Sequence, residues 1–151
     1  MEKSFRLNEF LPFRLNVLAQ TVSERLSAIY GEKFGLDIPQ WRIIANLASW
    51  GAITAQDIAR LTYSHKSTIS RAVQQLEDRH LIKRNVSKED KRSFTLNLTN
   101  DGRRLFRQLL PLVLEYERNL LSTISEADSR ALIKGLSALE STLLSKSRED
   151  Q

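Results

Sequence analysis

ITAQDIARLTYSHKSTISRAVQQLEDRHL, residues 53–81, decides the fold together with IKRNVSKEDKRSFTLNLT, residues 82–99, which follows it directly. The first part predicts a short helix, a turn and a basic second helix. The second part predicts two strands joined by a charged loop. This order of elements indicates a partner that is a nucleic acid, provided that charge and helix faces agree.

The excess of basic residues lies almost entirely in this stretch. The chain of 151 residues carries 23 Lys and Arg against 18 Asp and Glu, a net charge of +5. Residues 54–92 carry nine basic against five acidic residues, whereas residues 1–53 carry six against five and residues 93–151 eight against eight. A localised positive field attracts polyanions, and phosphate contacts supply most sequence-independent affinity for nucleic acid. Charge alone leaves a solvated basic face as the alternative.

The second helix of the stretch separates an apolar face from a polar one. Ile69, Ala72, Val73 and Leu76 recur at helical spacing. The opposite face offers hydroxyls, amides and a guanidinium, groups that suit base edges and phosphates in the major groove. The predicted DNA contacts of this helix are Ser64, His65, Lys66, Ser67, Thr68, Ser70, Arg71, Gln74 and Gln75. A plain polar surface is the alternative.

The strands after this helix predict a hairpin with a projecting basic tip. Phe94, Leu96 and Leu98 alternate with polar residues, and Leu81, Ile82 and Val86 outline the partner strand. A basic tip beside such a helix can reach an adjacent minor groove. The predicted contacts of this wing are Arg84, Ser87, Lys88, Asp90, Lys91 and Arg92. Arg92 is the leading candidate, and Asp90 is expected to fix the tip by pairing with Arg84 or Arg92. A tip charged only for solubility is the alternative.

Capping signatures predict the other helices. Pro12 begins a long helix that stops near Gly35, and Asp37 with Gln40 forms a capping box for a helix whose buried face is Trp41, Ile44, Ala45, Leu47 and Ala48. Thr54 with Asp57 repeats the signature, which makes Thr54 and Gln56 candidates for a phosphate contact at a helix N-terminus.

The C-terminal third of the chain predicts two further helices, whose apolar residues indicate a dimer interface rather than a catalytic site. Thr99 caps the first of them, and Ser125 with Asp128 caps the second. Leu132, Ile133, Leu136, Leu139 and Leu143 form a continuous apolar stripe. Such a stripe is most simply buried against a second copy of the chain, although packing on its own domain is the alternative.

Residues 54–102 resemble the MarR family of bacterial regulators. The matching motifs are STISRAVQQLE, LIKR, EDKRS with an Asp-x-Arg pattern on Asp90 and Arg92, and LTNDG. The flanking helices also fit, so the resemblance covers nearly the whole chain. One departure is His80, which stands where the family usually has a glycine. That position often needs a left-handed backbone, which a residue other than glycine adopts at a cost of roughly 1 kcal/mol.

The resemblance implies a mainly α fold with a small β-hairpin wing. Residues 1–151 would form one domain, with a winged helix–turn–helix DNA-binding part at residues 36–99 and dimerisation helices at residues 1–35 and 100–151. It also implies a homodimer that binds double-stranded DNA at a palindromic operator, usually as a repressor released by a small molecule. Two DNA-binding parts would then span half-sites about 10 base pairs apart.

The family commonly holds its ligand between the dimerisation helices and the DNA-binding part. Candidate lining residues here combine aromatic surface with guanidinium groups that can clamp a carboxylate: Phe10, Phe13, Arg14, Trp41, Arg42 and Phe106. We therefore expect an aromatic or acyl carboxylate as effector. Aromatic residues that are simply core are the alternative.

Several classes of function are disfavoured. The two histidines, His65 and His80, do not share one helix face, and no phosphate loop, nucleophile motif or metal-ligand spacing occurs, so we expect no catalysis, no metal site and no cofactor. The chain has no cysteine, which excludes disulfides and thiol switches. No apolar run suits a membrane span or a signal peptide, so a cytoplasmic protein is expected. The remaining rival is a winged-helix protein-interaction module without sequence-specific DNA binding.

Overall fold

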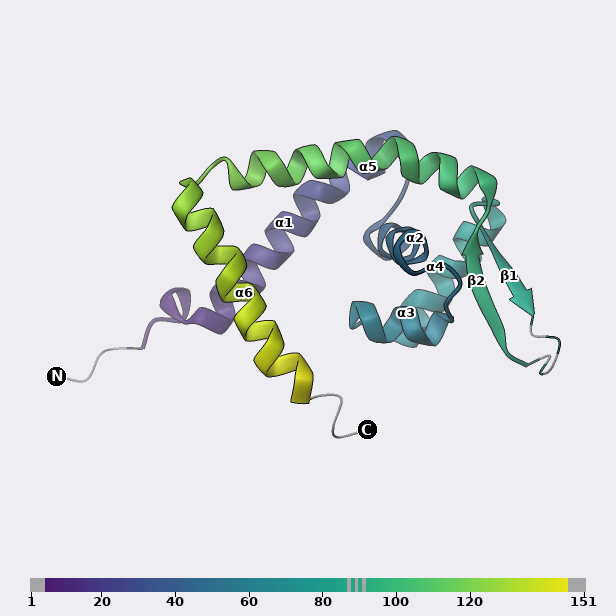
Figure 1. The fold of residues 1–151 in the computed structure, drawn as a ribbon, viewed down its shortest axis with the longest axis horizontal. Helices are drawn as coiled ribbons and strands as arrows, with labels where there is room; N and C mark the ends of the chain where they lie inside the picture. Colours follow the sequence, from purple (N-terminus) through teal and green to yellow (C-terminus); the bar gives the residue numbers. More distant parts are fainter. Residues whose placement is uncertain (1–4, 87, 89, 91, 147–151) are drawn as a thin grey trace. The chain divides into compact units, whose positions relative to one another are not determined.

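The computed structural model describes residues 5–86, 88, 90 and 92–146. Contacts divide the chain into two compact units, Met1–Leu112 and Val113–Gln151. Its helices and strands follow one another in this order (Figure 1): η1 Leu7–Glu9, α1 Leu11–Phe34, α2 Ile38–Trp50, α3 Ala55–Thr62, α4 Lys66–Asp78, β1 Ile82–Val86, β2 Phe94–Leu98, α5 Asn100–Leu121 and α6 Glu126–Lys146. The predicted class, mainly helical with a two-stranded hairpin, is confirmed.

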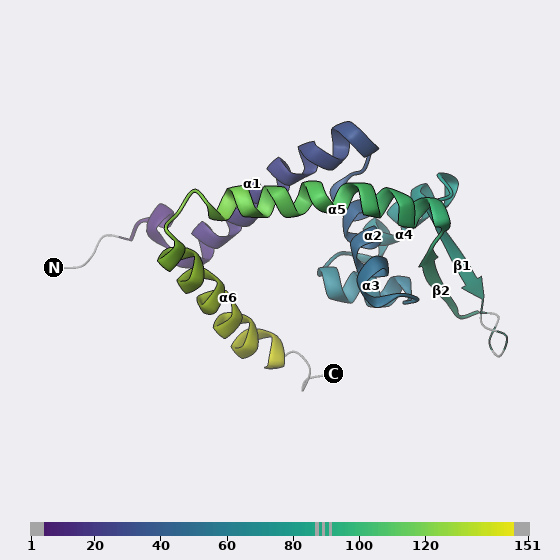
Figure 2. The same ribbon diagram turned by 45° about the horizontal axis from the view of Figure 1, so that its top comes forward.

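The first unit packs α2, α3 and α4 against the base of the hairpin. Strands β1 and β2 are antiparallel, with Ile82 opposite Leu98 and Val86 opposite Phe94. The apolar face predicted for α4 is confirmed, because all four of its residues are buried. Buried side chains of the neighbouring elements belong to the same core: Ile43, Ile44, Leu47, Ile58, Leu96 and Leu98. Figures 1 and 2 both show the hairpin extending beyond these helices.

The local signals at the helix ends are confirmed. Asp37 and Gln40 form a reciprocal capping box at α2, and Thr54 and Asp57 form another at α3. Gly35 ends α1 in the left-handed conformation, with a φ of 61°. His80 has a φ of 56°, so the left-handed backbone expected at this position is present without a glycine.

One prediction of burial, that of Ala48, is wrong, and an apolar residue of the predicted strand, Val86, lies at the surface. Val86 is 59% exposed, because the outer end of β1 runs past the helices and only its first residue is buried. Ala48 is exposed on α2, whereas Ile43, which the sequence pattern omitted, is fully buried. The buried side of α2 therefore includes Ile43, and this helix packs on α4.

The start of α5 is tied to the chain just before β1. The Thr99 hydroxyl accepts the N–H of Gly102 at 3.0 Å and donates to the carbonyl of His80 at 2.6 Å. Gly102 is buried, and a Cβ placed on it would lie 2.0 Å from the carbonyl oxygen of Leu81. This close approach requires glycine, because backbone atoms cannot swing aside.

The second unit contains α6, whose N-terminus is capped as predicted. The Ser125 hydroxyl accepts the N–H of Asp128 at 3.0 Å and donates to its carboxylate at 2.7 Å. The apolar stripe on α6 is exposed in the single chain, with Leu143 63% exposed. Among the described residues, no helix is both long and apolar enough to cross a membrane.

Candidate nucleic-acid interface

Helix α4 presents a polar face to solvent. Ser67, Ser70, Arg71 and Gln74 are all exposed, and they lie opposite the buried side of the helix. Within the part of the chain that is described, Arg71 forms no ion pair. The Gln74 amide donates to the Asp78 carboxylate at 2.9 Å. This face therefore offers hydroxyl, amide and guanidinium groups for hydrogen bonds with an external partner.

The first turn of α4 is open at its N-terminus. His65 occupies the N-cap position, and its side chain makes no capping hydrogen bond. His65 and Lys66 are exposed, whereas Thr68 is half-buried. Ser64 lies in the preceding turn, where its hydroxyl accepts a hydrogen bond from Thr62 at 2.9 Å. Uncapped N–H groups beside a lysine suit a phosphate.

Gln75 was expected to contact bases, but the structure ties it to α2. Its Oε1 accepts a hydrogen bond from Nε2 of Gln40 at 2.9 Å. Gln40 is buried, and its own Oε1 accepts the N–H of Asp37 at 3.0 Å. Bidentate recognition of adenine needs both the oxygen and the nitrogen of a glutamine amide. In this arrangement Gln75 links the capping box of α2 to α4.

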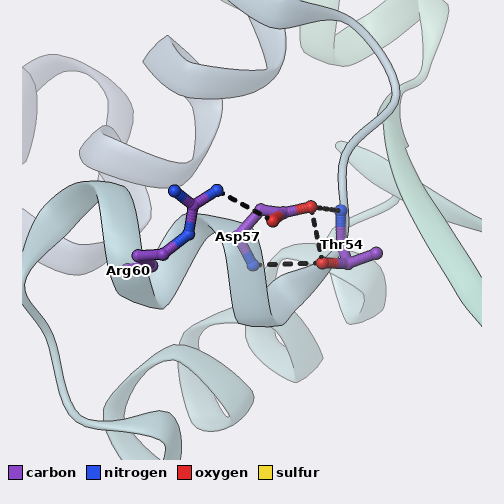
Figure 3. Close-up of polar contacts among 3 residues, drawn as sticks. All are labelled: Thr54, Asp57 and Arg60. Atoms are coloured by element: carbon purple, nitrogen blue, oxygen red, sulfur yellow. Dashed lines mark hydrogen bonds and ion pairs between the residues drawn. The ribbon is translucent and has the colours of Figure 1, made fainter. Parts of the chain in front are cut away.

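Helix α3 begins with a closed set of hydrogen bonds (Figure 3). The Thr54 hydroxyl accepts the N–H of Asp57 at 3.0 Å and donates to its carboxylate at 2.8 Å. Arg60 donates to the other carboxylate oxygen at 3.2 Å. The hydrogen bond from the Thr54 hydroxyl, with that from Arg60, holds the pKa of Asp57 below its usual value. The Thr54 hydroxyl is thus occupied within the helix cap, while Gln56 beside it is exposed.

Two small hollows lie between the start of α3 and the hairpin, and the first of them also reaches α4. One of about 260 Å³ is lined by Ala55, Gln56, Lys66, Ser70, Val73, Arg84 and Phe94. The other, of about 320 Å³, is lined by Thr54, Ala55, Gln56, Arg92, Ser93 and Phe94. Both contain Gln56 and at least one basic side chain, and neither contains an acidic one. Together they bring residues of three predicted contact regions, the start of α3, α4 and the wing, next to one another.

Asp90 organises the tip of the hairpin. Its carboxylate accepts the N–H of Arg92 at 2.9 Å, and its carbonyl accepts the N–H of Ser93 at 3.0 Å. Lys88 and Arg92 are exposed. Ser87 and Lys91, which were also predicted to contact DNA, lie outside the described residues.

Arg84 has a different carboxylate partner from the one that was expected. Its guanidinium donates to both oxygens of Glu77, with Nε at 2.8 and 2.9 Å and a second nitrogen at 2.8 Å. The guanidinium carbon also lies 4.6 Å from the centre of the Phe94 ring. Arg84 therefore joins the hairpin to the C-terminal end of α4.

Arg79 is a structural residue that sequence reasoning missed. Its guanidinium donates to the carbonyls of Phe34 at 2.6 Å and Gly35 at 3.0 Å. These carbonyls end α1, where a helix leaves acceptors without helical partners. Nothing local in the sequence marks this contact, because Arg79 lies 44 and 45 residues away from the two acceptors.

The predicted ligand residues fall into separate groups. Phe13 and Arg42 line one groove of about 600 Å³ between α1 and α2, with Asn16, Val17, Ala19, Gln20, Ser23, Glu24 and Ile38. This volume lies within the range of small-molecule sites. Arg14 is exposed and is not among the lining residues.

The other predicted ligand residues are in aromatic contacts. Trp41 stacks between Tyr30, at 5.6 Å, and Phe106, at 6.4 Å, as measured between ring centres. Burial raises the pKa of Tyr30 to about 12, against a smaller opposing effect of Arg42. Phe10 packs edge-on against Phe5. The structure thus brings Phe13 together with Arg42, and Trp41 together with Phe106.

Comparison with known proteins agrees with this geometry. A family model described as the MarR family matches residues 36–94. A solved MarR/EmrR family transcriptional regulator from Acinetobacter sp. ADP1 is 30% identical, with a TM-score of 0.81 over 92% of this chain and 98% of that one. The chain belongs to the MarR family. It is also 27% identical over 117 residues to YfiV of Bacillus subtilis, an uncharacterized HTH-type transcriptional regulator, covering 78% of this chain and 73% of YfiV.

Two more distant solved structures share the fold. The DNA complex of MepR from S. aureus is 23% identical, with a TM-score of 0.77 over 89% of this chain and 98% of MepR. BpsR of Bordetella bronchiseptica, whose DNA binding is regulated by 6-hydroxynicotinic acid, is 21% identical, with a TM-score of 0.71 over 84% and 98%. Membership of the MarR family makes this chain a transcriptional regulator, and its fold is a winged helix.

Proposed function

We propose that this MarR-family regulator is a homodimeric repressor that binds a palindromic operator and is released by a small carboxylate ligand. The main support for DNA binding is that α4 has one buried apolar side and one exposed polar side. Its apolar side is buried in the core, whereas Ser67, Ser70 and Arg71 face solvent beside two positively lined hollows. Insertion of this face into a major groove would bring the hollows toward the phosphates. The existence of a MepR–DNA complex with the same fold supports the proposal.

Contacts to bases and contacts to phosphates are proposed for different residues. Arg71, Ser70 and Gln74 would address base edges, since they lie at the centre of the exposed face of α4. Lys66 and Gln56 would bind phosphate. Arg92 would enter the adjacent minor groove, where the negative potential of narrow A·T tracts favours arginine.

The homodimer is proposed from apolar side chains that the single chain leaves exposed. They include Leu11 and Leu18 on α1 and Leu132, Ile133 and Leu143 on α6. Burial of such side chains is favourable by about 1.5–3 kcal/mol each, so a second copy is the simplest partner. Light scattering coupled to gel filtration should give twice the 17.4 kDa mass of one chain, and a monomer would contradict the proposal.

The effector is proposed to bind the groove between α1 and α2. Arg42 offers a guanidinium and Phe13 an aromatic surface, which together suit an aryl or acyl carboxylate. Glu24 and Gln20 line the same groove and would accept or donate hydrogen bonds to a hydroxyl or amide on the ligand. The regulation of BpsR by an aromatic acid is consistent with this chemistry.

The effector site has a matched pair of test variants. Arg42→Ala should abolish release from DNA by a panel of aromatic acids while leaving DNA binding intact, because Arg42 lines the groove. Arg14→Ala, which removes an exposed arginine of α1 outside that groove, should respond like the wild type. If Arg14→Ala loses the response and Arg42→Ala keeps it, the ligand does not lie in this groove.

The DNA-binding proposal is tested by titrating the protein against duplex DNA from its own upstream region at several salt concentrations. Neutralised phosphates release counterions, so affinity should fall steeply as salt rises. The rival function, a winged helix used only to bind proteins, predicts weak DNA binding with little dependence on salt.

For a regulator that acts in the cytoplasm, we expect no catalytic activity and no cofactor. Among the residues that are described, no cluster of acidic residues and histidines could hold a metal ion.

A further inference from the structure

Arg84 occupies an inward-facing position on the hairpin. Along β1, Arg84 pairs with Leu96, and Ile82 pairs with Leu98. Ile82, Leu96 and Leu98 are buried, with Leu96 fully so. Because side chains alternate between the two faces of a strand, Arg84 shares the face of Ile82, which is turned toward the helices.

Two contacts fix the Arg84 guanidinium there. Glu77 of α4 receives hydrogen bonds on both carboxylate oxygens, at 2.8 and 2.9 Å from Nε. The Phe94 ring of β2 lies beneath the guanidinium, 4.6 Å from its central carbon. A planar guanidinium can form a fork with a carboxylate and stack on a ring at the same time, which a lysine cannot do. The three side chains connect α4, β1 and β2.

The pair with Glu77 also cancels the charge of Arg84. The Glu77 side chain is only 20% exposed, against 41% for that of Arg84. A carboxylate at the end of α4 would repel DNA if it had no cation beside it, and the arginine neutralises it. Arg84 therefore adds little net attraction for phosphate, in contrast to Lys66 and Arg92.

We propose that Arg84 is a positioning residue that sets the separation between the recognition helix α4 and the wing. It thereby determines how well major-groove and minor-groove contacts are made on the same operator. The inference rests on the proposed DNA-binding function and assigns Arg84 to sequence discrimination rather than to phosphate binding. The alternative is a direct phosphate contact, because Arg84 also lines the hollow that contains Lys66 and Ser70.

The salt dependence of DNA affinity separates these two roles. Each phosphate that a protein neutralises contributes a slope of about −0.9 to a plot of log affinity against log salt concentration. The double variant Glu77→Gln/Arg84→Gln keeps the net charge of the pair at zero and removes the ionic link. It is compared with the wild type on a duplex selected by the wild-type protein from random oligonucleotides and on a scrambled duplex of equal length.

The double variant should keep the wild-type salt slope on the scrambled duplex. Its preference for the selected duplex should fall about five-fold or more, within the range that coupled residue pairs show. Lys66→Gln, which removes a proposed phosphate contact, should lower the slope by about 0.9 for each protomer bound. Arg84→Lys should lose discrimination like the double variant although the charge remains, because lysine cannot reproduce the fork and the stacking.

The single variant Glu77→Gln is a second test, because affinity and discrimination should change in opposite directions. It frees Arg84 from its carboxylate, so affinity for the scrambled duplex should rise while discrimination falls. Circular dichroism and thermal unfolding of each variant at equal concentration show whether the fold is intact.

If the double variant folds and its salt slope falls by about 0.9 for each protomer bound, the value for one phosphate, Arg84 is a phosphate contact and the inference is overturned. Retention of full discrimination by that variant or by Arg84→Lys would also overturn it. Wild-type binding that does not respond to salt would instead overturn the proposed DNA-binding function itself.

Discussion

Replacement of Gly102 by alanine tests the close contact between α5 and the chain that leads into the wing. The added Cβ would lie 2.0 Å from the Leu81 carbonyl oxygen and 3.3 Å from a methyl carbon of Leu98. Carbon–oxygen contacts in proteins are rarely closer than about 3.3 Å. The backbone must therefore separate by roughly 1.3 Å at this point.

The energetic cost follows from what holds Leu81 in place. Its carbonyl accepts hydrogen bonds from the N–H of Thr99 at 3.1 Å and from the Thr99 hydroxyl at 3.2 Å. Overpacking costs about 1–3 kcal/mol, and a weakened hydrogen bond costs about 1 kcal/mol more. Alanine recovers about 1 kcal/mol of helix propensity. The expected net loss of stability is about 1–3 kcal/mol.

The assay is thermal unfolding followed by circular dichroism, at one protein concentration because oligomers melt at a concentration-dependent temperature. For a chain of this size, 1 kcal/mol corresponds to a shift of about 2–4 °C, so Tm should fall by roughly 2–12 °C.

Gly31→Ala is the matched control. Its Cβ would also face a backbone carbonyl oxygen, that of Leu36, but at an ordinary 3.6 Å. Tm should rise slightly in this variant because helix propensity improves. A Gly102→Ala variant that melts within a degree of the wild type, or above it, would refute the reasoning, since it would show that the Leu81 carbonyl yields without cost.

Other predictions concern DNA contacts, pH and backbone strain. Arg92→Ala should weaken operator binding without changing Tm, since its side chain is exposed, and unchanged affinity in a gel-shift titration would remove the wing from the mechanism. Arg71→Ala should relax the base preference found by selection on random oligonucleotides; the same consensus with the variant would show that Arg71 does not read bases. The pKa of Tyr30 is raised from 10.0 to about 12 by burial, so the unfolded state loses this proton first. The contribution of the Tyr30 proton to the free energy of unfolding is therefore fully present below pH 10 and is lost as pH rises toward 12. Denaturant titrations should show a smaller alkaline decline in stability for Tyr30→Phe. His80→Gly should raise stability by up to about 1 kcal/mol by relieving the positive φ of 56°, and a lower Tm would contradict that explanation.

Local signals in the sequence were sufficient for the helices and for the two faces of α4. Capping boxes at Asp37 and Thr54 join residues three positions apart, and the helix repeat alone assigns Ile69 to the core. The same locality explains the alternation in β2. Such features depend on neighbours along the chain, so they can be recognised without the fold.

Partners of exposed polar side chains could not be predicted in this way. Gln75 carries the right chemistry for adenine, yet Gln40 holds its oxygen from 35 residues away. Arg84 looks like a phosphate contact, yet it turns inward to Glu77. Likewise, Val86 fits the apolar pattern of β1, but it lies beyond the end of the core.

The sequence by itself determined where the α-helices begin, which face of α4 is buried and where the positive charge gathers, because these depend on spacing and composition. Only the tertiary structure decided which basic residues are available to DNA and which are used within the protein. The physical reason is that a guanidinium or an amide serves either purpose equally well. Its role depends on whether folding brings a carboxylate or a carbonyl within hydrogen-bonding distance, as it does for Arg84 and Arg79.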